Sequence, residues 1–250
     1  MHALLVFCAA AVAGAINSVA GGGTLVSFPT LIWLGVPSIV ANATNTVALV
    51  PGSIGSVWGY RREVAGADPR VFALIVPSVI GAIVGAVLLY RTPAELFDRL
   101  VPILILFATI LFMVQEPIQR RFNLTAAHEA RSHWLSWTMF FQLLVGLYGG
   151  YFGAGIGILM LAALSLIGHT DIHQMNGLKN VLASCINAVA SAYFIWAGLV
   201  IWPDALIMAV GAIIGGVGGA GVARRIGRKA VRRIVVGVGF AMALGLMFRL

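Results

Sequence analysis

The stretch that decides the fold is GAINSVAGGG at residues 14–23, because a related stretch, GLYGGYFGAG, returns at residues 146–155. In both places a cluster of glycines interrupts an apolar run. A short apolar segment follows each cluster, and then a polar group, ANATNTV at residues 41–47 and MNGLKNV at residues 175–181. A duplicated apolar chain with matching interruptions is typical of secondary transporters, whose binding site lies where the two repeats meet.

The composition places the chain in a lipid bilayer. Hydrophobic residues make up 60% of the 250 residues and charged residues only 10%, so most of the surface is too apolar to face water. At about 20 residues per crossing, the length allows roughly 8–10 spans and no soluble domain. The clearest apolar spans are residues 71–90, 100–115, 134–151, 171–196, 205–223 and 234–248. The expected fold class is therefore all-α, a polytopic membrane protein.

The basic residues predict how the chain is oriented. The net charge of +8 lies in short connections between apolar spans, so it does not indicate a nucleic-acid-binding surface. The connections near residues 61–70, 120–131 and 224–233 are rich in arginine, and the positive-inside rule places them in the cytoplasm. The connections at 91–99 and 197–204 then face outward. Corresponding loops of the two halves lie on opposite sides, which predicts two inverted-topology repeats.

This reading divides the chain into a first transmembrane repeat at residues 1–115, a cytoplasmic linker at 116–133 and a second transmembrane repeat at 134–250. Inverted repeats need an odd number of crossings per half. Five spans meet that condition, as do three spans plus a re-entrant hairpin made of residues 3–34 and, in the second half, 136–167. Both alternatives stay open at this point. We expect a multi-pass protein of the bacterial inner membrane with both termini in the periplasm.

The two glycine clusters are the first candidate binding element. Non-helical backbone inside a membrane is tolerated where it is buried in protein or lines a watery cavity, and a broken helix frees N–H groups that hold an anion. Close helix packing is the alternative interpretation, and it accounts well for GAIVG at residues 81–85 and GAIIG at 211–215. The clusters and their flanks predict substrate-binding roles for Gly22, Gly23, Thr24, Gly153 and Gly155.

A polar stripe on the long span after each cluster is the second element. Helical spacing places Asn176, Asn180, Ser184 and Asn187 on one face, and Asn42, Thr46 and Ser53 on the matching face of the first copy. Lys179 stands next to this face and aligns with Asn45. A lysine near the membrane interior costs on the order of 2.5–3.5 kcal/mol, so it usually has a partner or a task. We interpret Asn42, Asn45, Asn176, Lys179 and Asn180 as an anion site; the alternative is that the amides link helices and the lysine reaches the cytoplasmic edge.

Other chemistry is weakly indicated. His169 and His173 stand four residues apart, but a solvated loop explains them better than a metal or proton site. The eight acidic residues lie in or beside predicted connections, so no membrane-embedded carboxylate of the kind used by proton-driven pumps is expected. No nucleophile and base share one membrane depth. The sequence therefore predicts no enzyme, no metal and no cofactor.

Several motifs together resemble the sulfite exporter TauE/SafE family of membrane transporters. They are Gly21-Gly22-Gly23-Thr24 followed by Pro29, Asn42-Ala43-Thr44-Asn45, the run NGLKNVLA at residues 176–183, and Trp202-Pro203 leading into AVGAIIGG at 209–216 before an arginine-rich loop. The resemblance covers nearly the whole chain. It implies a permease for sulfite, sulfonates or related sulfur-containing or organic anions. The second glycine cluster departs from a more glycine-dense pattern at Ala154 and Ile156.

The sequence thus predicts an alternating-access permease for a small anion, in which the halves rock about a midplane site between the broken helices. An anion channel or a non-transporting membrane scaffold is the competing class. The expected partners are the anionic solute and the lipid bilayer, and self-association is left open.

Overall fold

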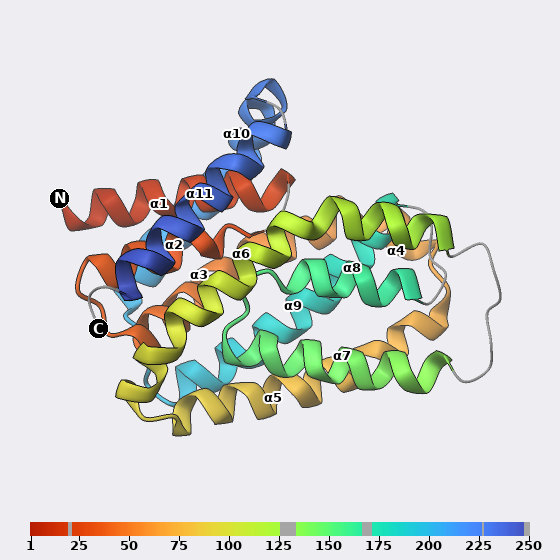
Figure 1. Cartoon of the computed structure of the whole chain (residues 1–250), viewed down its shortest axis with the longest axis horizontal. Helices are drawn as coiled ribbons and strands as arrows, with labels where there is room; N and C mark the ends of the chain where they lie inside the picture. The colour runs from red at the N-terminus through yellow and green to blue at the C-terminus, as the bar shows by residue number, and fades with distance from the viewer. Residues whose placement is uncertain (20–21, 126–133, 167–171, 227, 248–250) are drawn as a thin grey trace.

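The computed structural model describes residues 1–19, 22–125, 134–166, 172–226 and 228–247, and this part of the chain is helical with no β-strand (Figure 1). The first half contains α1 (His2–Val19), α2 (Thr24–Trp33), α3 (Ser38–Gly59), α4 (Arg61–Ala65), the 3-10 helix η1 (Pro69–Leu74), α5 (Ile75–Arg91) and α6 (Ala94–Thr125). The second half contains α7 (Trp134–Tyr151), α8 (Ile156–Leu166), α9 (Ile172–Trp196), α10 (Trp202–Ile226) and α11 (Arg228–Met247). The prediction of an all-α fold is confirmed.

Both glycine clusters break the helix, as the sequence predicts. The first cluster separates α1 from α2, and the second separates α7 from α8. Gly22, Gly153 and Gly155 have φ angles of 90°, 79° and 76°, a left-handed conformation that side-chain-bearing residues rarely adopt. Glycine is therefore needed for the chain to turn at these points.

The two broken segments are helical hairpins that run in opposite directions. In Figure 1, α1 runs from the N-terminus toward the middle of the molecule and α2 returns, whereas α7 enters from the opposite end before α8 returns to it. The returning helices have 10 and 11 residues, which corresponds to about 15–17 Å, half the thickness of a bilayer core. Helices α3 and α9 also run in opposite directions, and both termini lie at the end away from α4 (Figure 1).

Helices α1 and α10 pack with their backbones in contact. A Cβ atom added to Gly14 would stand 2.2 Å from the carbonyl oxygen of Ala212, and one added to Gly215 only 1.9 Å from that of Ala11. Such distances leave no room for any side chain. Small residues that let helix backbones approach are a common basis of helix association in membranes.

Helices α5 and α7 form a second close pair of the same kind. A Cβ atom at Gly85 would lie 2.1 Å from the carbonyl oxygen of Leu147, and one at Gly150 would lie 2.2 Å from that of Ala82. The close-packing interpretation of GAIVG and GAIIG therefore holds at these glycines. Each pair combines one helix from each half, so the halves interlock.

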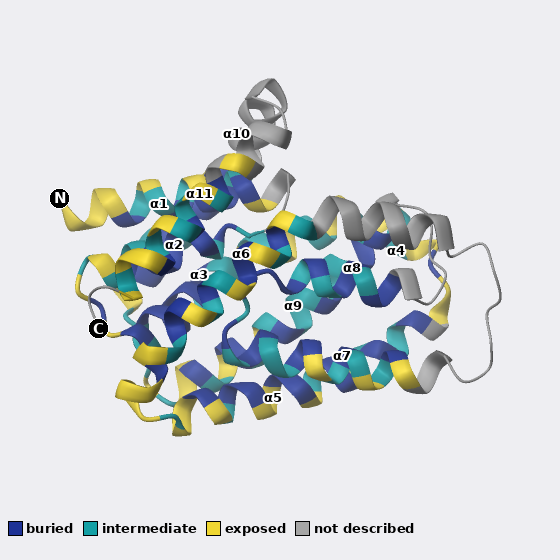
Figure 2. Ribbon diagram, viewed as in Figure 1, coloured by how far each residue is buried: buried dark blue, intermediate teal, exposed yellow. Residues whose placement is uncertain are grey.

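The outer surface suits a membrane. Three helical stretches of the described residues are long and apolar enough to cross one: Val71–Arg91, Ala94–Val114 and Gln174–Trp196. They match the predicted spans 71–90, 100–115 and 171–196. Shorter apolar helices occur at His2–Asn17, Thr24–Trp33, Trp202–Gly216 and Val235–Met247. Large hydrophobic side chains such as Ile80 and Val84 are exposed, and exposed positions recur along the outward faces of α1, α5 and α7 (Figure 2).

Helix α6 extends further than the sequence indicates. It continues to Thr125, so the first part of the stretch expected to be a linker, residues 116–133, is helical. Glutamine, glutamate and arginine in this stretch are good helix formers, so the helix continues beyond the apolar residues. Residues 126–133 lie outside the described part of the chain.

Candidate functional site

A cavity of about 660 Å³ lies where the two glycine breaks meet. Among the predicted site residues, its wall includes Gly22, Thr24, Asn45, Gly153, Gly155, Lys179 and Asn180. The wall thus draws on both halves of the chain, on the breaks and on the polar stripes. The predicted residues Gly23, Asn42 and Asn176 lie outside the wall.

Lys179 brings a cation to the second break. Its side chain passes so close to Gly157, in the first turn of α8, that a Cβ atom there would lie 3.1 Å from the lysine Cδ. Its Nζ donates to Oδ1 of Asn176 at 3.2 Å, so Asn176 holds the ammonium group from outside the wall. The start of a helix carries partial positive charge. Lys179 and the start of α8 therefore make this wall electropositive.

Asn45 supplies the matching polar group from the first half. It is only 1% exposed, and its Oδ1 accepts a hydrogen bond of 2.6 Å from Oγ of Ser27. This contact leaves the Nδ2 group as the donor that Asn45 can offer to the cavity. Asn180 and Asn187 also line the cavity. The cavity therefore combines amide donors with a cation, which suits an anion.

Different side chains hydrogen-bond to the backbone of the two breaks. Oδ1 of Asn17 accepts the N–H of Gly23 at 2.8 Å, so this N–H is already satisfied within the protein. In the second break, the hydroxyl of Tyr148 donates to the carbonyl oxygen of Ala154 at 2.8 Å. The rings of Phe28 and Phe152 meet edge to face, with centroids 5.2 Å apart. This contact joins the first returning helix to the second break.

Asn42 links helices, which is the alternative interpretation of the stripe. Its Nδ2 donates to the carbonyl oxygen of Tyr151, the last residue of α7, at 3.1 Å. The side chain is 1% exposed, and its Oδ1 has no hydrogen-bond partner. Asn42 thereby fixes α3 to the second break without facing the cavity.

Some wall residues were not singled out from the sequence. They are Asn17, Pro51, Gly52, Gly55, Ser56, Gly59, Tyr60 and Phe152, together with apolar residues of α1, α3, α8 and α10. The signal for the α3 group was present as PGSIGSVWGY at residues 51–60, a segment with several small residues inside a membrane helix. Asn17 lies within the first glycine-rich stretch, but its aligned residue in the second copy is Gly149.

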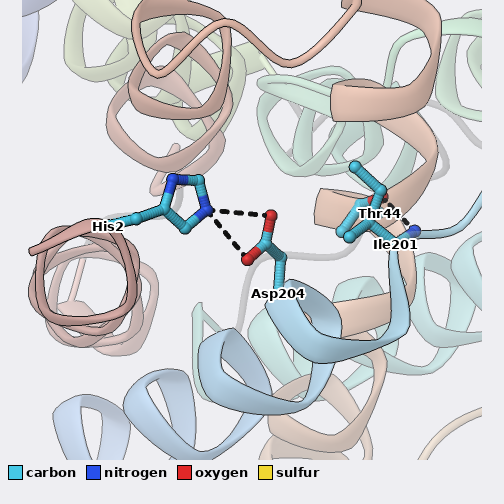
Figure 3. Close-up of polar contacts among 4 residues, drawn as sticks. All are labelled: His2, Thr44, Ile201 and Asp204. Atoms are coloured by element: carbon cyan, nitrogen blue, oxygen red, sulfur yellow. Dashed lines mark hydrogen bonds and ion pairs between the residues drawn. The ribbon is translucent and has the colours of Figure 1, made fainter.

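The first turn of α10 carries a buried carboxylate, that of Asp204. Asp204 is 6% exposed, and Nε2 of His2 lies 3.0 Å from its Oδ1 and 3.2 Å from its Oδ2 (Figure 3). Nearby, the N–H of Ile201 donates to Oγ1 of Thr44 at 3.0 Å. These contacts tie the start of α10 to α1 and α3. Asp204 does lie in the first turn of a helix beside a connection, but the fold buries it.

Among the described residues, no group of three or more His, Cys, Asp or Glu side chains could hold a metal ion. The side chains of His169 and His173, the weaker metal or proton candidates, lie outside the described residues.

Comparison with known proteins identifies the family. The chain is 27% identical over 248 residues to a probable membrane transporter protein of Haemophilus influenzae, covering 98% of this chain and 94% of the relative. It is 26% identical over 245 residues to the probable membrane transporter protein YfcA of Escherichia coli K12, covering 98% and 89%. No solved structure matches the chain. The family model described as sulfite exporter TauE/SafE matches residues 6–246, and the chain therefore belongs to this family of membrane transporters.

Proposed function

We propose that the protein is a secondary carrier for a small anion, with sulfite, a sulfonate or a related sulfur-containing organic anion as the first candidates. One observation carries the proposal. The cavity between the two breaks gathers Lys179, the amide of Asn45 and the start of α8, and none of the described residues in its wall is acidic. Neutral donors with one cation neutralise a small anion without holding it too tightly to release.

The packing supports two inverted repeats. The contact of α1 with α10 corresponds to that of α7 with α5, the contact of α2 with α11 corresponds to that of α8 with α6, and the contact of α3 with α10 corresponds to that of α9 with α5. The opposed directions of α1 and α7, and of α3 and α9 (Figure 1), agree with this relation. Two halves that exchange conformations generate a second state open to the other side, which is alternating access.

We propose that the moving bodies are the two close helix pairs and not the two halves of the chain. Residues 1–115 and 134–250 interlock through the α1–α10 and α5–α7 pairs, whose glycines touch the partner backbone. Separating the halves would break both pairs. Rocking therefore moves one helix pair against the other, and the central α3 and α9 carry the polar groups between them.

The end with α4 is the cytoplasmic side of a bacterial inner membrane in this proposal. Arg61 and Arg62 are exposed there, and the guanidinium of Arg61 lies 5.1 Å from the ring centre of the exposed Trp58. Tryptophan and arginine at a helix end are typical of a membrane–water boundary, with the arginines inside. Both chain termini, at the opposite end in Figure 1, then lie in the periplasm.

The binding test is calorimetry on purified protein, with sulfite and methanesulfonate as ligands and chloride as the control. Saturable binding of one oxyanion, with no heat from chloride, supports the proposal. No binding by any sulfur oxyanion or sulfonate overturns the solute class.

The flux test uses proteoliposomes and separates the competing classes. A carrier's flux saturates with solute concentration, a channel's flux rises without saturating, and a scaffold passes none.

A further inference from the structure

The cavity wall follows α3 beyond the breaks. Toward the α4 end it follows the second half of α3, where Gly52, Gly55 and Gly59 all line it. A Cβ atom added to any of these glycines would meet nothing within 4 Å. These glycines are therefore unlike those of the tight helix pairs, because open space rather than a neighbouring backbone lies beside them.

Two equivalent positions on α9 are packed instead of open. In the repeat alignment that pairs Asn42 with Asn176, Gly52 corresponds to Ile186 and Ser56 to Ala190. Both of these α9 side chains are 0% exposed. Ile186 packs so near Gly149 that a Cβ atom there would lie 2.8 Å from its Cγ2. The two repeats therefore differ at these two pairs of positions, which line the cavity on α3 and are packed on α9, whereas Ser53 and its partner Asn187 both line it.

Side-chain contacts close the end away from α4. Ser38 donates a hydrogen bond to Asp98, and Oγ1 of Thr44 accepts the N–H of Ile201 at 3.0 Å. The rings of Phe97 and Tyr151 pack edge to face at 5.7 Å between centroids. None of these residues lines the cavity.

We propose that the second half of α3, from Ser53 to Tyr60, is the cytoplasmic route of the solute, and that the packed Ile186 and Ala190 of α9, with the contacts at the end away from α4, close the periplasmic side. This inference rests on the proposed function for its solute and on the cavity for its path. The inner end of the path is Asn45, which is 1% exposed and lines the cavity.

The chemistry of the route suits a hydrated anion. Ser53, Ser56 and Tyr60 line it. The two serine hydroxyls donate to the carbonyl oxygens of Val50 and Gly52 within α3, so their oxygens can accept from water, and the glycines between them leave width for that water. Arg61 and Arg62 follow directly on Tyr60. Positive charge at the mouth of a low-dielectric path raises the local concentration of anions.

Cysteine labelling tests the route. Cys8 and Cys185 are first replaced by alanine, and then Ser56→Cys is compared with the matched Ala190→Cys, and Gly55→Cys with the matched Val189→Cys. The probes are membrane-impermeant methanethiosulfonates, one carrying a sulfonate and one a quaternary ammonium. We expect the α3 cysteines to react at least tenfold faster than their α9 partners in inside-out vesicles. Equal rates within the pairs, or α3 labelling only from the periplasmic side, would overturn the proposal.

A second measurement tests the route and the anion site independently of each other. In the Ser56→Cys background, Lys179→Met should lower the rate with the sulfonate reagent relative to the ammonium reagent. If the α3 cysteines react from the cytoplasmic side but this ratio does not change, the route stands and the anion site at Lys179 is wrong. If they are unreactive while purified protein still binds sulfite, the site stands and the route is wrong.

Discussion

Lys179 and Gly157 fit together as a pair, because the lysine Cδ lies only 3.1 Å from the place where a Cβ atom of residue 157 would stand. That spacing is shorter than an ordinary carbon–carbon contact of about 3.5–4.0 Å. Glycine at position 157 thus lets the lysine stem cross the first turn of α8. The cation and the helix start then act on the same part of the cavity.

Replacing Lys179 by methionine keeps the bulk of the side chain and removes the charge. If the lysine holds the anion, affinity should fall at least tenfold, about 1.4 kcal/mol, when measured by calorimetry. Arg99→Met removes an exposed charge elsewhere and should leave affinity unchanged. Unaltered affinity in Lys179→Met would mean that the lysine is an interfacial anchor.

The backbone of the breaks predicts an order of stability. Gly155 has room for a Cβ, with its nearest neighbour 3.7 Å away, but its φ is +76°. Asparagine tolerates this conformation better than other residues, whereas a β-branched valine should lose about 1–2 kcal/mol. At Gly22 the φ is +90°, and a Cβ would also lie 2.9 Å from Cε2 of Phe112. In detergent, Gly155→Asn should therefore have the highest melting temperature of the three variants, Gly155→Val a lower one, and Gly22→Val the lowest.

Because of this order, loss of transport in the valine variants would not by itself report on anion binding. Strain and collision together make misfolding the expected result for Gly22→Val, so only the Gly155→Asn variant reports on anion binding at the break. A Gly22→Val protein that melts like the unmodified chain would show that the first break is not held in its left-handed turn.

The repeat comparison explains both what the sequence revealed and what it missed. Lys179 and Asn45 could be found because alignment of the copies brings them together, and both line the cavity. Asn17 could not, because its aligned residue is Gly149 and a criterion based on repetition discards it. Asn42 falls on the same helical face as true wall residues, yet it contacts the end of α7. Helical periodicity gives a direction around the axis but does not say which neighbour lies there.

The close helix pairs also show what the sequence could not predict, namely which helices are neighbours. The sequence indicated close packing at GAIVG and GAIIG, but small residues do not specify their partner. Only the fold shows that these segments pair across the halves. Burial of Asp204 likewise depends on contact with α1, which begins about 200 residues earlier in the chain.

The tight helix pairs predict strong intolerance to a single methyl group. At Gly215 an added Cβ would lie 1.9 Å from the backbone oxygen of Ala11, whereas at Gly237 it would meet nothing within 4 Å. Gly215→Ala should therefore separate α1 from α10 and lower the yield of folded protein and its melting temperature. Gly237→Ala should be neutral or gain up to about 1 kcal/mol from helix propensity. Equal stability of the two variants would contradict the close packing of the α1–α10 pair.

The last prediction concerns the driving force. A negative interior expels a monovalent anion with about 2.3 kcal/mol per 100 mV, and the part of the cavity wall that the structure describes has no acidic side chain to carry a proton. Efflux therefore needs no coupling ion. In proteoliposomes, anion efflux should follow an imposed potential and should not respond to a pH gradient when the protonation of the anion itself is held constant.

Asp204 makes that test sharper, because it is a buried carboxylate beside an imidazole (Figure 3). Its contacts lie outside the cavity wall, so Asp204→Asn should keep potential-driven flux. If transport is instead electroneutral, or stops when the pH gradient is collapsed, a proton is coupled to the anion. Loss of that coupling in Asp204→Asn would then place the proton on the His2–Asp204 pair, and its persistence would direct attention to His169 and His173.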